Sequence, residues 1–519
     1  MGDHGSLERT TERRLRRQTI EPIQPTTPDE LDDVVDYSRK WHAMAAVGIG
    51  IFMATIDGSI VNVALPTLVR DLQTTFNVVQ WVVLAYLLTQ ATLLLGVGRL
   101  ADMRGKKPLY TGGFVVFTTG SVLCGLAPTV GLLIAARVVQ AVGASMILAL
   151  GLAIITEAFP PNERGKALGV AGSTVSVGIA IGPTLGGLLI DALSWHWIFF
   201  VNLPVGIVGT WLAWRYVPDV RPAGGQQFDY GGAATLFASL LALLLALTLG
   251  QDYGFTAPPM LLLFAVFAVL LLLFIFLEQR HPQPMIDLRL FRNPLFSVNL
   301  VTGFMTFVAI AGAIILNPFY LELVLGYGPA QVGLMLSVVP IALGITAPIS
   351  GSLSDRLGTR PITVVGLLIL VLGYFTMSTL STETSTFGFI ARFLPVGIGM
   401  GVFQSPNNSA VMGSAPRRHL GIASGLLAIT RTLGQTAGIA VIGALWAARV
   451  FARGGGPLPG GATAAAPADQ VAGLNEVYIA LVIFMTAALV LGLWGLWRQH
   501  RSRRRQERAP SSEGRARIS

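Results

Sequence analysis

The stretch GRLADMRGKKP, residues 98–108, decides the fold, because a close copy, GSLSDRLGTRP, follows at residues 351–361. Each copy lies between two apolar runs of roughly 20 residues, the length of a helix that crosses a bilayer. Both copies carry the pattern G-x-L-x-D-x-x-G, with Gly98, Asp102 and Gly105 in the first and Gly351, Asp355 and Gly358 in the second. A loop motif repeated between apolar segments predicts an internally duplicated membrane protein.

Further landmarks recur at nearly the same distance along the chain. Offsets of 252 to 255 residues relate Pro66 to Pro318, Arg137 to Arg392, Gly169 to Gly421, Gly182 to Gly434, and Gly186 to Gly438. Near-constant offsets predict two halves in the same orientation. Parallel halves are related by an axis along the membrane normal, which predicts a central cavity between them.

Composition supports a chain that lies largely in lipid. Of 519 residues, 53% are apolar and 12% are charged, whereas soluble domains average about 25% charged residues. The apolar runs predict an all-α integral membrane protein with 14 transmembrane helices: two parallel-repeat six-helix bundles and two inserted linker helices. We place the spans at 42–65, 80–100, 108–127, 131–156, 167–190, 198–217, 231–250, 259–277, 297–321, 331–354, 361–380, 387–411, 420–447 and 475–497.

The basic residues predict the orientation. With both termini cytoplasmic, 30 of the 36 Lys and Arg residues fall in cytoplasmic segments and three fall outside, as the positive-inside rule requires. The placement of basic residues on the cytoplasmic side of the membrane therefore accounts for the net charge of +9, and we expect no nucleic-acid partner. The predicted organisation is a disordered cytoplasmic tail at 1–40, a six-helix bundle at 41–217, the inserted pair at 228–278, a second bundle at 296–497 and a basic cytoplasmic tail at 498–519.

Two charged residues lie inside predicted spans of the first half. Asp57, in IFMATIDGSIVNVALP (51–66), falls past the midpoint of its span, where lipid exposure of a carboxylate is too costly. It is either a structural carboxylate bonded to another helix or a proton or cation site. Arg137 is either an arginine whose side chain reaches the membrane interface or a fixed positive charge that acts on a nearby carboxylate.

Two glycine-containing motifs are candidates for segments that move during a conformational change. The loop motif, with Lys106 in the first copy and Arg356 in the second, is interpreted as a gating latch in which the glycines allow close helix approach and a tight turn. Gly178, Gly182 and Gly186 stand at i, i+4 and i+8, a side-chain-free stripe on which a helix can pack closely. Pro183 within this stripe predicts a bend or hinge. Asn62 and Arg431 are candidate polar residues of the cavity.

Four of these segments together resemble the major facilitator superfamily, and with fourteen spans they resemble its drug/proton antiporter branch of multidrug efflux proteins. They are IDGSIVNVALP (56–66), the loop motif at 98–107, RVVQAVG (137–143) and GPTLGG (182–187). The resemblance extends over about residues 40–500. It implies protonation or cation recognition at Asp57, proton transfer at Arg137, antiport at the Gly178–Gly186 motif and control of interconversion at Gly98, Asp102 and Gly105.

Some relatives in that branch carry carboxylates in the tenth and thirteenth spans, whereas this chain has none there and carries Arg431 in the thirteenth. That difference leaves room for neutral, zwitterionic or anionic substrates. The resemblance implies a proton-driven exporter of small amphiphilic compounds in the cell membrane, without cofactor or metal. We expect a monomer whose partners are its substrate, protons and the bilayer.

Alternative functions are export of a lipid or natural product, and uptake or facilitated transport. A membrane-embedded enzyme is disfavoured because the chain has no H-E-x-x-H, no G-x-S-x-G and no Cys/His cluster. It also has no G-x-x-x-x-G-K-[ST] phosphate loop, so the energy for transport is expected to come from a gradient.

Overall fold

The computed structural model describes residues 37–160, 163–219, 229–280, 288–414, 420–454, 456, 458 and 460–507. Every regular element in these residues is helical. The predicted tail residues 1–36 and 508–519 lie outside the described residues, as do most of the two links that flank the inserted pair. In chain order the elements are η1 (Tyr37–Arg39), α2 (Lys40–Asp71), α3 (Phe76–Arg104), α4 (Lys106–Gly125), α5 (Val130–Ala158), α6 (Arg164–Ala192), α7 (Trp197–Phe200), α8 (Asn202–Tyr216), α9 (Tyr230–Tyr253), α10 (Pro258–Arg280), η2 (Leu288–Arg292), α11 (Pro294–Phe319), η3 (Tyr320–Val324), α12 (Pro329–Leu336), α13 (Val338–Leu357), α14 (Thr359–Met377), α15 (Thr386–Ser414), α16 (Leu420–Arg453), η5 (Ala462–Ala464) and α17 (Pro467–Glu507).

Within the described residues, twelve helices or consecutive helix pairs are long and apolar enough to cross a membrane. Two further predicted spans correspond to α4 and α9, which fall outside that set. The all-helical membrane fold is therefore confirmed, while the total of fourteen spans stays a prediction. The last helix, α17, continues to Glu507, beyond the predicted boundary at residue 497. Its final turns are rich in Arg, Gln and Glu, which are good helix formers in water.

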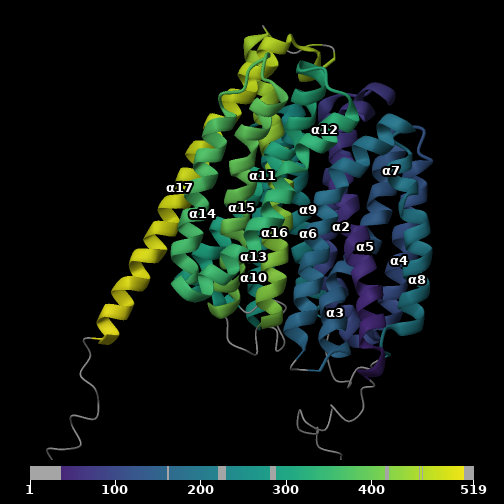
Figure 1. The fold of residues 1–519 in the computed structure, drawn as a ribbon, viewed down its shortest axis with the longest axis vertical. Helices are drawn as coiled ribbons and strands as arrows, with labels where there is room; N and C mark the ends of the chain where they lie inside the picture. The colour runs from purple at the N-terminus through teal and green to yellow at the C-terminus, as the bar shows by residue number, and fades with distance from the viewer. Residues whose placement is uncertain are drawn as a thin grey trace, which may run out of the picture.

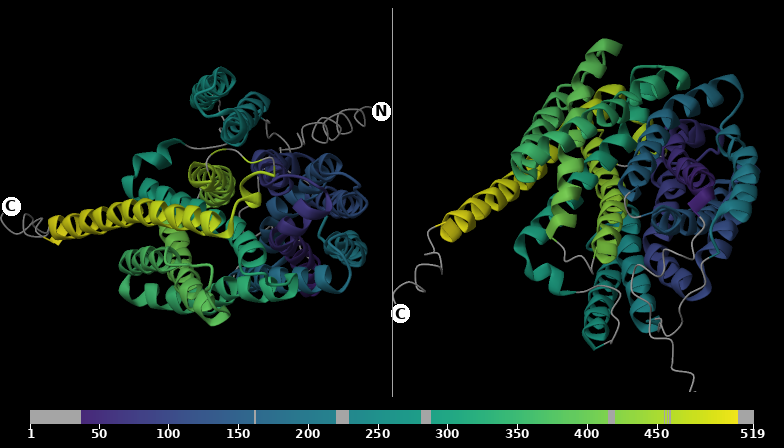
Figure 2. Two further views of the ribbon diagram at one scale, coloured as in Figure 1. Left: turned by 90° about the horizontal axis from the view of Figure 1, so that it is seen from above. Right: turned by 60° about the horizontal axis from the view of Figure 1, so that its bottom comes forward.

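The long helices run side by side and alternate in direction (Figure 1). The end of the bundle that carries the start of α2 and the end of α17 is called the tail face here. The opposite end, which carries the segment 454–466, is called the far face. Seen from the far face, the N-terminal half and the C-terminal half lie next to each other, and α9 and α10 stand outside both (Figure 2).

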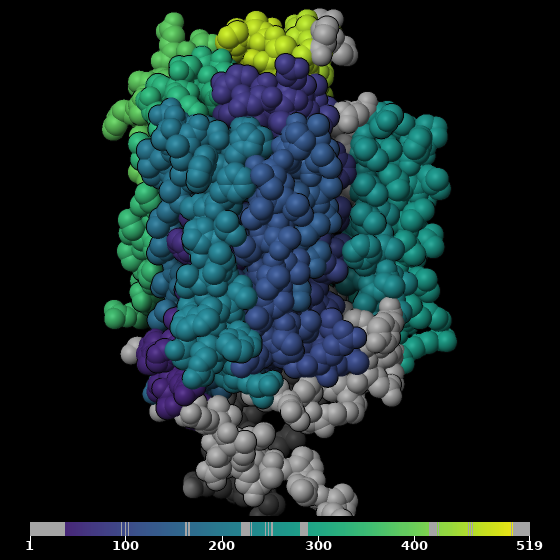
Figure 3. Space-filling view, turned by 90° about the vertical axis from the view of Figure 1, so that its right-hand side faces the viewer, coloured from purple at the N-terminus to yellow at the C-terminus, as the bar shows by residue number. Residues whose placement is uncertain are grey.

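The two halves repeat the same helix contacts. In the N-terminal half α2 packs on α6 and α4 packs on α5, and in the C-terminal half α11 packs on α16 and α14 packs on α15. The inserted pair is peripheral, since α9 contacts α10, α3 and α16, and α10 is mostly exposed on its surface (Figure 3). The inserted helices therefore cover one side of the seam between the halves.

The repeated loop motif has one backbone conformation in both halves. Gly105 joins α3 to α4 with φ 94° and ψ 147°, and Gly358 joins α13 to α14 with φ 91° and ψ 150°. A positive φ of this size is costly for any residue with a Cβ. The turn between the two helices therefore explains why each copy of the motif has a glycine at its last position.

Replacement of these two glycines tests that explanation. We expect Gly105→Ala and Gly358→Ala each to destabilise the protein by about 1–3 kcal/mol, because the alanine is forced into a positive-φ, extended conformation that is essentially restricted to glycine. The matched control is Gly98→Ala, since Gly98 lies within α3 and a Cβ there would have no neighbour within 4 Å. The thermal unfolding midpoint of each purified variant gives the comparison, and equal midpoints for all three would contradict the explanation.

Candidate functional site

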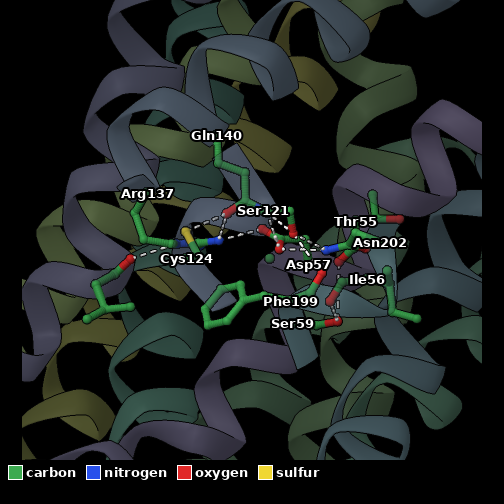
Figure 4. A network of polar contacts seen from close by, with 12 residues as sticks. Thr55, Ile56, Asp57, Ser59, Ser121, Cys124, Arg137, Gln140, Phe199 and Asn202 are labelled. Atoms are coloured by element: carbon green, nitrogen blue, oxygen red, sulfur yellow. Dashed lines mark hydrogen bonds and ion pairs between the residues drawn. The ribbon is translucent and has the colours of Figure 1, made fainter. Parts of the chain in front are cut away.

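Asp57 lies in the middle of α2 and is completely buried. Its Oδ2 accepts a hydrogen bond from Arg137 Nη1 at 2.6 Å, and its Oδ1 accepts bonds from Gln140 Nε2 at 2.7 Å and from Asn202 Nδ2 at 3.3 Å. Both carboxylate oxygens are thus bonded, and the partners come from α5 and α8 (Figure 4). Asp57 faces the interior of the N-terminal half.

Arg137 pairs with this carboxylate in the same buried layer. Its side chain is 1% exposed, its Nε donates to the Val82 carbonyl oxygen at 3.0 Å, and its guanidinium lies 4.1 Å from the centre of the Tyr86 ring. The alternative in which this arginine reaches the membrane interface is therefore wrong. A buried ion pair is tolerated only when each partner is also hydrogen-bonded, which is the case here.

The network extends to residues that the sequence did not single out. Gln140 accepts from Arg137 Nη1 at 2.7 Å while its own Nε2 donates to Asp57 and to Ser121 Oγ. Asn202 also donates to Ser121 Oγ, at 3.0 Å. The sequence did contain one indication for Gln140, because this residue stands three positions after Arg137 and so lies on the same face of the helix. Asn202 and Ser121 lie on other helices, and no local pattern connects them to Asp57.

Small residues allow this layer to form. A Cβ at Gly120 of α4 would lie 2.5 Å from Gln140 Cα, and a Cβ at Gly143 of α5 would lie 2.3 Å from Phe117 N. The two helices therefore touch through their backbones at these glycines. That close approach brings Ser121 of α4 within reach of Gln140.

Another helix packs closely on the Gly178–Gly186 stripe, as predicted, and the structure shows that this helix is α2. A Cβ would lie 2.3 Å from Thr55 Oγ1 at Gly178, 1.9 Å from Ser59 Oγ at Gly182 and 2.7 Å from Ile60 Cγ1 at Gly186. The contacted residues lie next to Asp57 along α2. The stripe thus fixes how close α6 lies to the helix that carries the buried carboxylate.

A cavity of about 750 Å³ lies between the two halves. Its walls come from α2, α6, α11, α12, α13, α15 and α16, and most of the lining residues are apolar. The lining reaches Leu168 of α6 and Asn408 of α15, which are near the tail-face ends of these helices. The cavity therefore extends toward the tail face.

Asn62 and Arg431 both line this cavity. They also line a smaller space of about 140 Å³ that reaches Arg137 and Tyr86. The two residues nominated as cavity side chains therefore lie between the central cavity and the buried ion pair. Asp57 is not part of either lining, because it lies behind Arg137 in the N-terminal half.

Contacts between the halves close the cavity on the far face. Thr184 Oγ1 of α6 lies 2.7 Å from Ser337 Oγ, which joins α12 to α13, and a Cβ at Gly333 of α12 would lie 2.2 Å from the Pro183 carbonyl oxygen. Nearby, the ring of Phe76 packs edge-on against Phe319 and Trp446 of the other half. Pro183 of the predicted hinge is thus part of this closure.

The residues of the loop motif lie at the tail face and away from the buried pair. Lys106 forms an ion pair with Glu157 at the end of α5, while Asp355 and Arg356 are exposed. The side chain of Asp102 is outside the described part of the structure. The prediction of close helix approach at Gly98 is wrong for this conformation, because a Cβ there would have no neighbour within 4 Å. At Gly351 the approach is close, since a Cβ would lie 2.9 Å from Ser405 Oγ. The latch role stays a prediction.

The described residues contain no group of three or more His, Cys, Asp or Glu side chains placed to hold a metal ion. What they contain is a duplicated helical bundle with a closed far face and a cavity between its halves. This arrangement defines a multi-pass membrane transporter.

Comparison with known proteins gives the family. The model of the Major Facilitator Superfamily matches residues 47–439, so the chain belongs to that superfamily and is a transporter, not an enzyme. It is 35% identical over 410 residues to the riboflavin transporter RibZ of Clostridioides difficile, covering 79% of this chain and 89% of that protein.

Two further relatives are named as multidrug proteins. The chain is 35% identical to the multidrug resistance protein Stp of Mycobacterium tuberculosis, covering 78% of this chain and 75% of Stp. It is 31% identical to the multidrug transporter protein MdtP of Bacillus subtilis, covering 79% and 76%. Among solved structures, a bacterial homologue of the human lysosomal transporter Spinster in an inward-facing conformation matches with a TM-score of 0.64 at 17% identity, covering 88% of this chain and 97% of that one. This last likeness concerns the fold alone.

Proposed function

We propose that the protein exports small amphiphilic molecules in exchange for protons by alternating access, with Asp57 as the proton-accepting group. The observation that carries the proposal is the buried carboxylate of Asp57 paired with the buried guanidinium of Arg137, next to a large and mostly apolar cavity that is closed on one face. Relatives named as multidrug transporters support export of amphiphiles.

The proposed orientation places the tail face in the cytoplasm, since the basic residues gather there. The cavity then opens inward, in the state that loads substrate from the cytoplasm. The proposal includes fourteen spans, a cell-membrane location, cytoplasmic termini, a monomer in the bilayer and no cofactor. In this state both oxygens of Asp57 are bonded, so proton uptake requires that Arg137 withdraw from the carboxylate as the halves rearrange.

The energy available is sufficient for useful export. One proton moving down 100 mV supplies about 2.3 kcal/mol, which corresponds to a roughly fifty-fold gradient of a neutral substrate. The proposed exchange requires no chemical step other than protonation of Asp57. Protonation removes the negative charge of Asp57 and thereby leaves Arg137 without its ion-pair partner.

Inverted vesicles with an imposed pH gradient test the proposal. We expect addition of a transported amphiphile to release protons from the acidic lumen, recorded with an internal pH dye, and we expect no release in vesicles that carry Asp57→Asn. Substrate uptake without proton movement would contradict antiport.

A second candidate function is transport of one particular metabolite, which the relative named as a riboflavin transporter favours. Riboflavin in the same assay separates the two. Uptake of riboflavin with no response to any other amphiphile would indicate a dedicated transporter, whereas responses to several unrelated compounds would support multidrug export.

A further inference from the structure

We propose that the central cavity selects amphiphiles that carry a negative charge, with Arg431 as the residue that binds the anionic group. This inference rests on the proposed function, since it assigns a substrate class to the same cavity. It concerns a residue that the transport cycle described above does not use.

The charges that line the cavity are the first observation. Among the described residues that line it, Arg431 is the only one with a formal charge, and no Asp or Glu is present. In the adjoining smaller space the only other charged side chain is Arg137, which is paired with Asp57. A ligand in the cavity therefore meets one uncompensated positive charge.

The second observation is that Arg431 has no acidic partner. The described residues provide it with no hydrogen bond and no ion pair, and its guanidinium carbon lies 5.9 Å from the centre of the Phe307 ring. That distance is at the limit of a cation–π contact. Arg431 is only half-buried and lines the cavity, so an anionic ligand that enters the cavity would supply the counter-charge that the guanidinium lacks.

The surroundings of Arg431 fit an amphiphile. Gln435 stands one turn further along α16 and also lines the cavity, and Asn62 lies on the facing helix α2. These side chains can bond to the polar part of a ligand. Phe307, Phe393 and Met400 contribute apolar wall, which suits the rest of an aromatic molecule.

The internal repeat shows that the charge belongs to one half. Residue 431 stands 252 positions after Ile179, and Ile179 lines the same cavity. In the same register, Ala309 stands 252 positions after Asp57. The N-terminal half thus holds the paired carboxylate, while the C-terminal half presents the unpaired arginine, so proton and anion are assigned to different halves.

Equilibrium binding to the full-length protein in nanodiscs of zwitterionic lipid tests this inference. The probes are 8-anilinonaphthalene-1-sulfonate and N-phenyl-1-naphthylamine, which share one aromatic skeleton and differ by the sulfonate. With the signal of protein-free discs subtracted, we expect the sulfonate to bind at least tenfold more tightly. In Arg431→Gln this preference should fall to less than twofold, and in Arg431→Lys part of it should remain.

The matched control is Arg392→Gln. Arg392 is another arginine of the C-terminal half, but it bonds to Thr379 Oγ1 and the Gly388 carbonyl oxygen and does not line the cavity. We expect this variant to keep the tenfold preference. Loss of preference in both variants would indicate a general effect of net charge and would overturn the assignment to Arg431.

A competition experiment on the wild type requires no variant to fold. Tetraphenylborate and tetraphenylphosphonium are similar in size and opposite in charge, and we expect the borate to displace the sulfonate probe at a concentration at least tenfold lower. Equal displacement, or stronger displacement by the phosphonium, would overturn the inference.

The two proposals can fail separately. Binding is measured without any gradient, so an anion preference that depends on Arg431 would stand even if the vesicles showed no proton exchange. Conversely, proton exchange with cationic or neutral compounds and no anion preference would leave antiport intact and refute the role of Arg431.

Discussion

Replacement of Asp57 by Asn is expected to abolish proton-linked transport and to destabilise the protein at the same time. The amide cannot take up the transported proton, and it leaves the buried guanidinium of Arg137 without a counter-charge. Loss of one member of a buried ion pair costs about 3–5 kcal/mol. A loss of transport in this variant alone would therefore not separate a role in coupling from a role in folding.

The double variant Asp57→Asn/Arg137→Gln separates the two roles. Both buried charges are removed, so we expect the thermal unfolding midpoint to recover most of the loss seen in the single variant, because a neutral pair carries little desolvation penalty. Proton release from vesicles should stay absent. If the double variant regains stability and also transports with proton movement, the pair is structural and the coupling site lies elsewhere.

Gly333→Val is expected to abolish transport while the protein remains folded. A Cβ at this position would lie 2.2 Å from the Pro183 carbonyl oxygen and 3.2 Å from Gly187 Cα, both in α6 of the other half. Backbone atoms cannot rotate away, so the valine must separate α12 from α6. The far face would then be unable to close, and the protein would be held away from the conformation described here.

Accessibility of a cysteine introduced at Ser337 measures this effect, because Ser337 is buried in the far-face closure and bonds to Thr184. With Gly333→Val, we expect a membrane-impermeant thiol reagent applied from the far face to label that cysteine at least tenfold faster. The native Cys124 is buried in the N-terminal half and is replaced by Ala in both backgrounds.

The matched control is Gly344→Val in α13, where a Cβ would have no neighbour within 4 Å. It introduces the same β-branched residue into the same half, so its effect on helix propensity is similar. We expect normal labelling and retained transport. Equal labelling rates in both valine variants would refute the closure contact at Gly333.

The sequence by itself determined that this protein is an all-helical membrane protein built from two related halves. Apolar runs of bilayer length predicted its helices, because lipid forces each backbone segment to satisfy its own hydrogen bonds. The repeated loop motif predicted two equivalent halves, and the shared positive φ of Gly105 and Gly358 gives the reason that both copies end in glycine. The glycine stripe of α6 was likewise predicted as a close-packing surface, since i, i+4 spacing is a property of one helix.

Only the tertiary structure decided what each buried charge meets. The sequence left Arg137 with two interpretations and did not connect Gln140, Ser121 or Asn202 to Asp57, because these residues come from four helices and their contacts depend on how the helices pack. It also did not show that Arg431 lines a cavity without an acidic residue, or that Gly333 touches Pro183 across the halves. A helix in lipid can be predicted from the local sequence, because its backbone hydrogen bonds join residues that are near each other in the chain. Contacts between side chains on different helices join residues that are far apart in the chain, and no periodicity in the sequence specifies them.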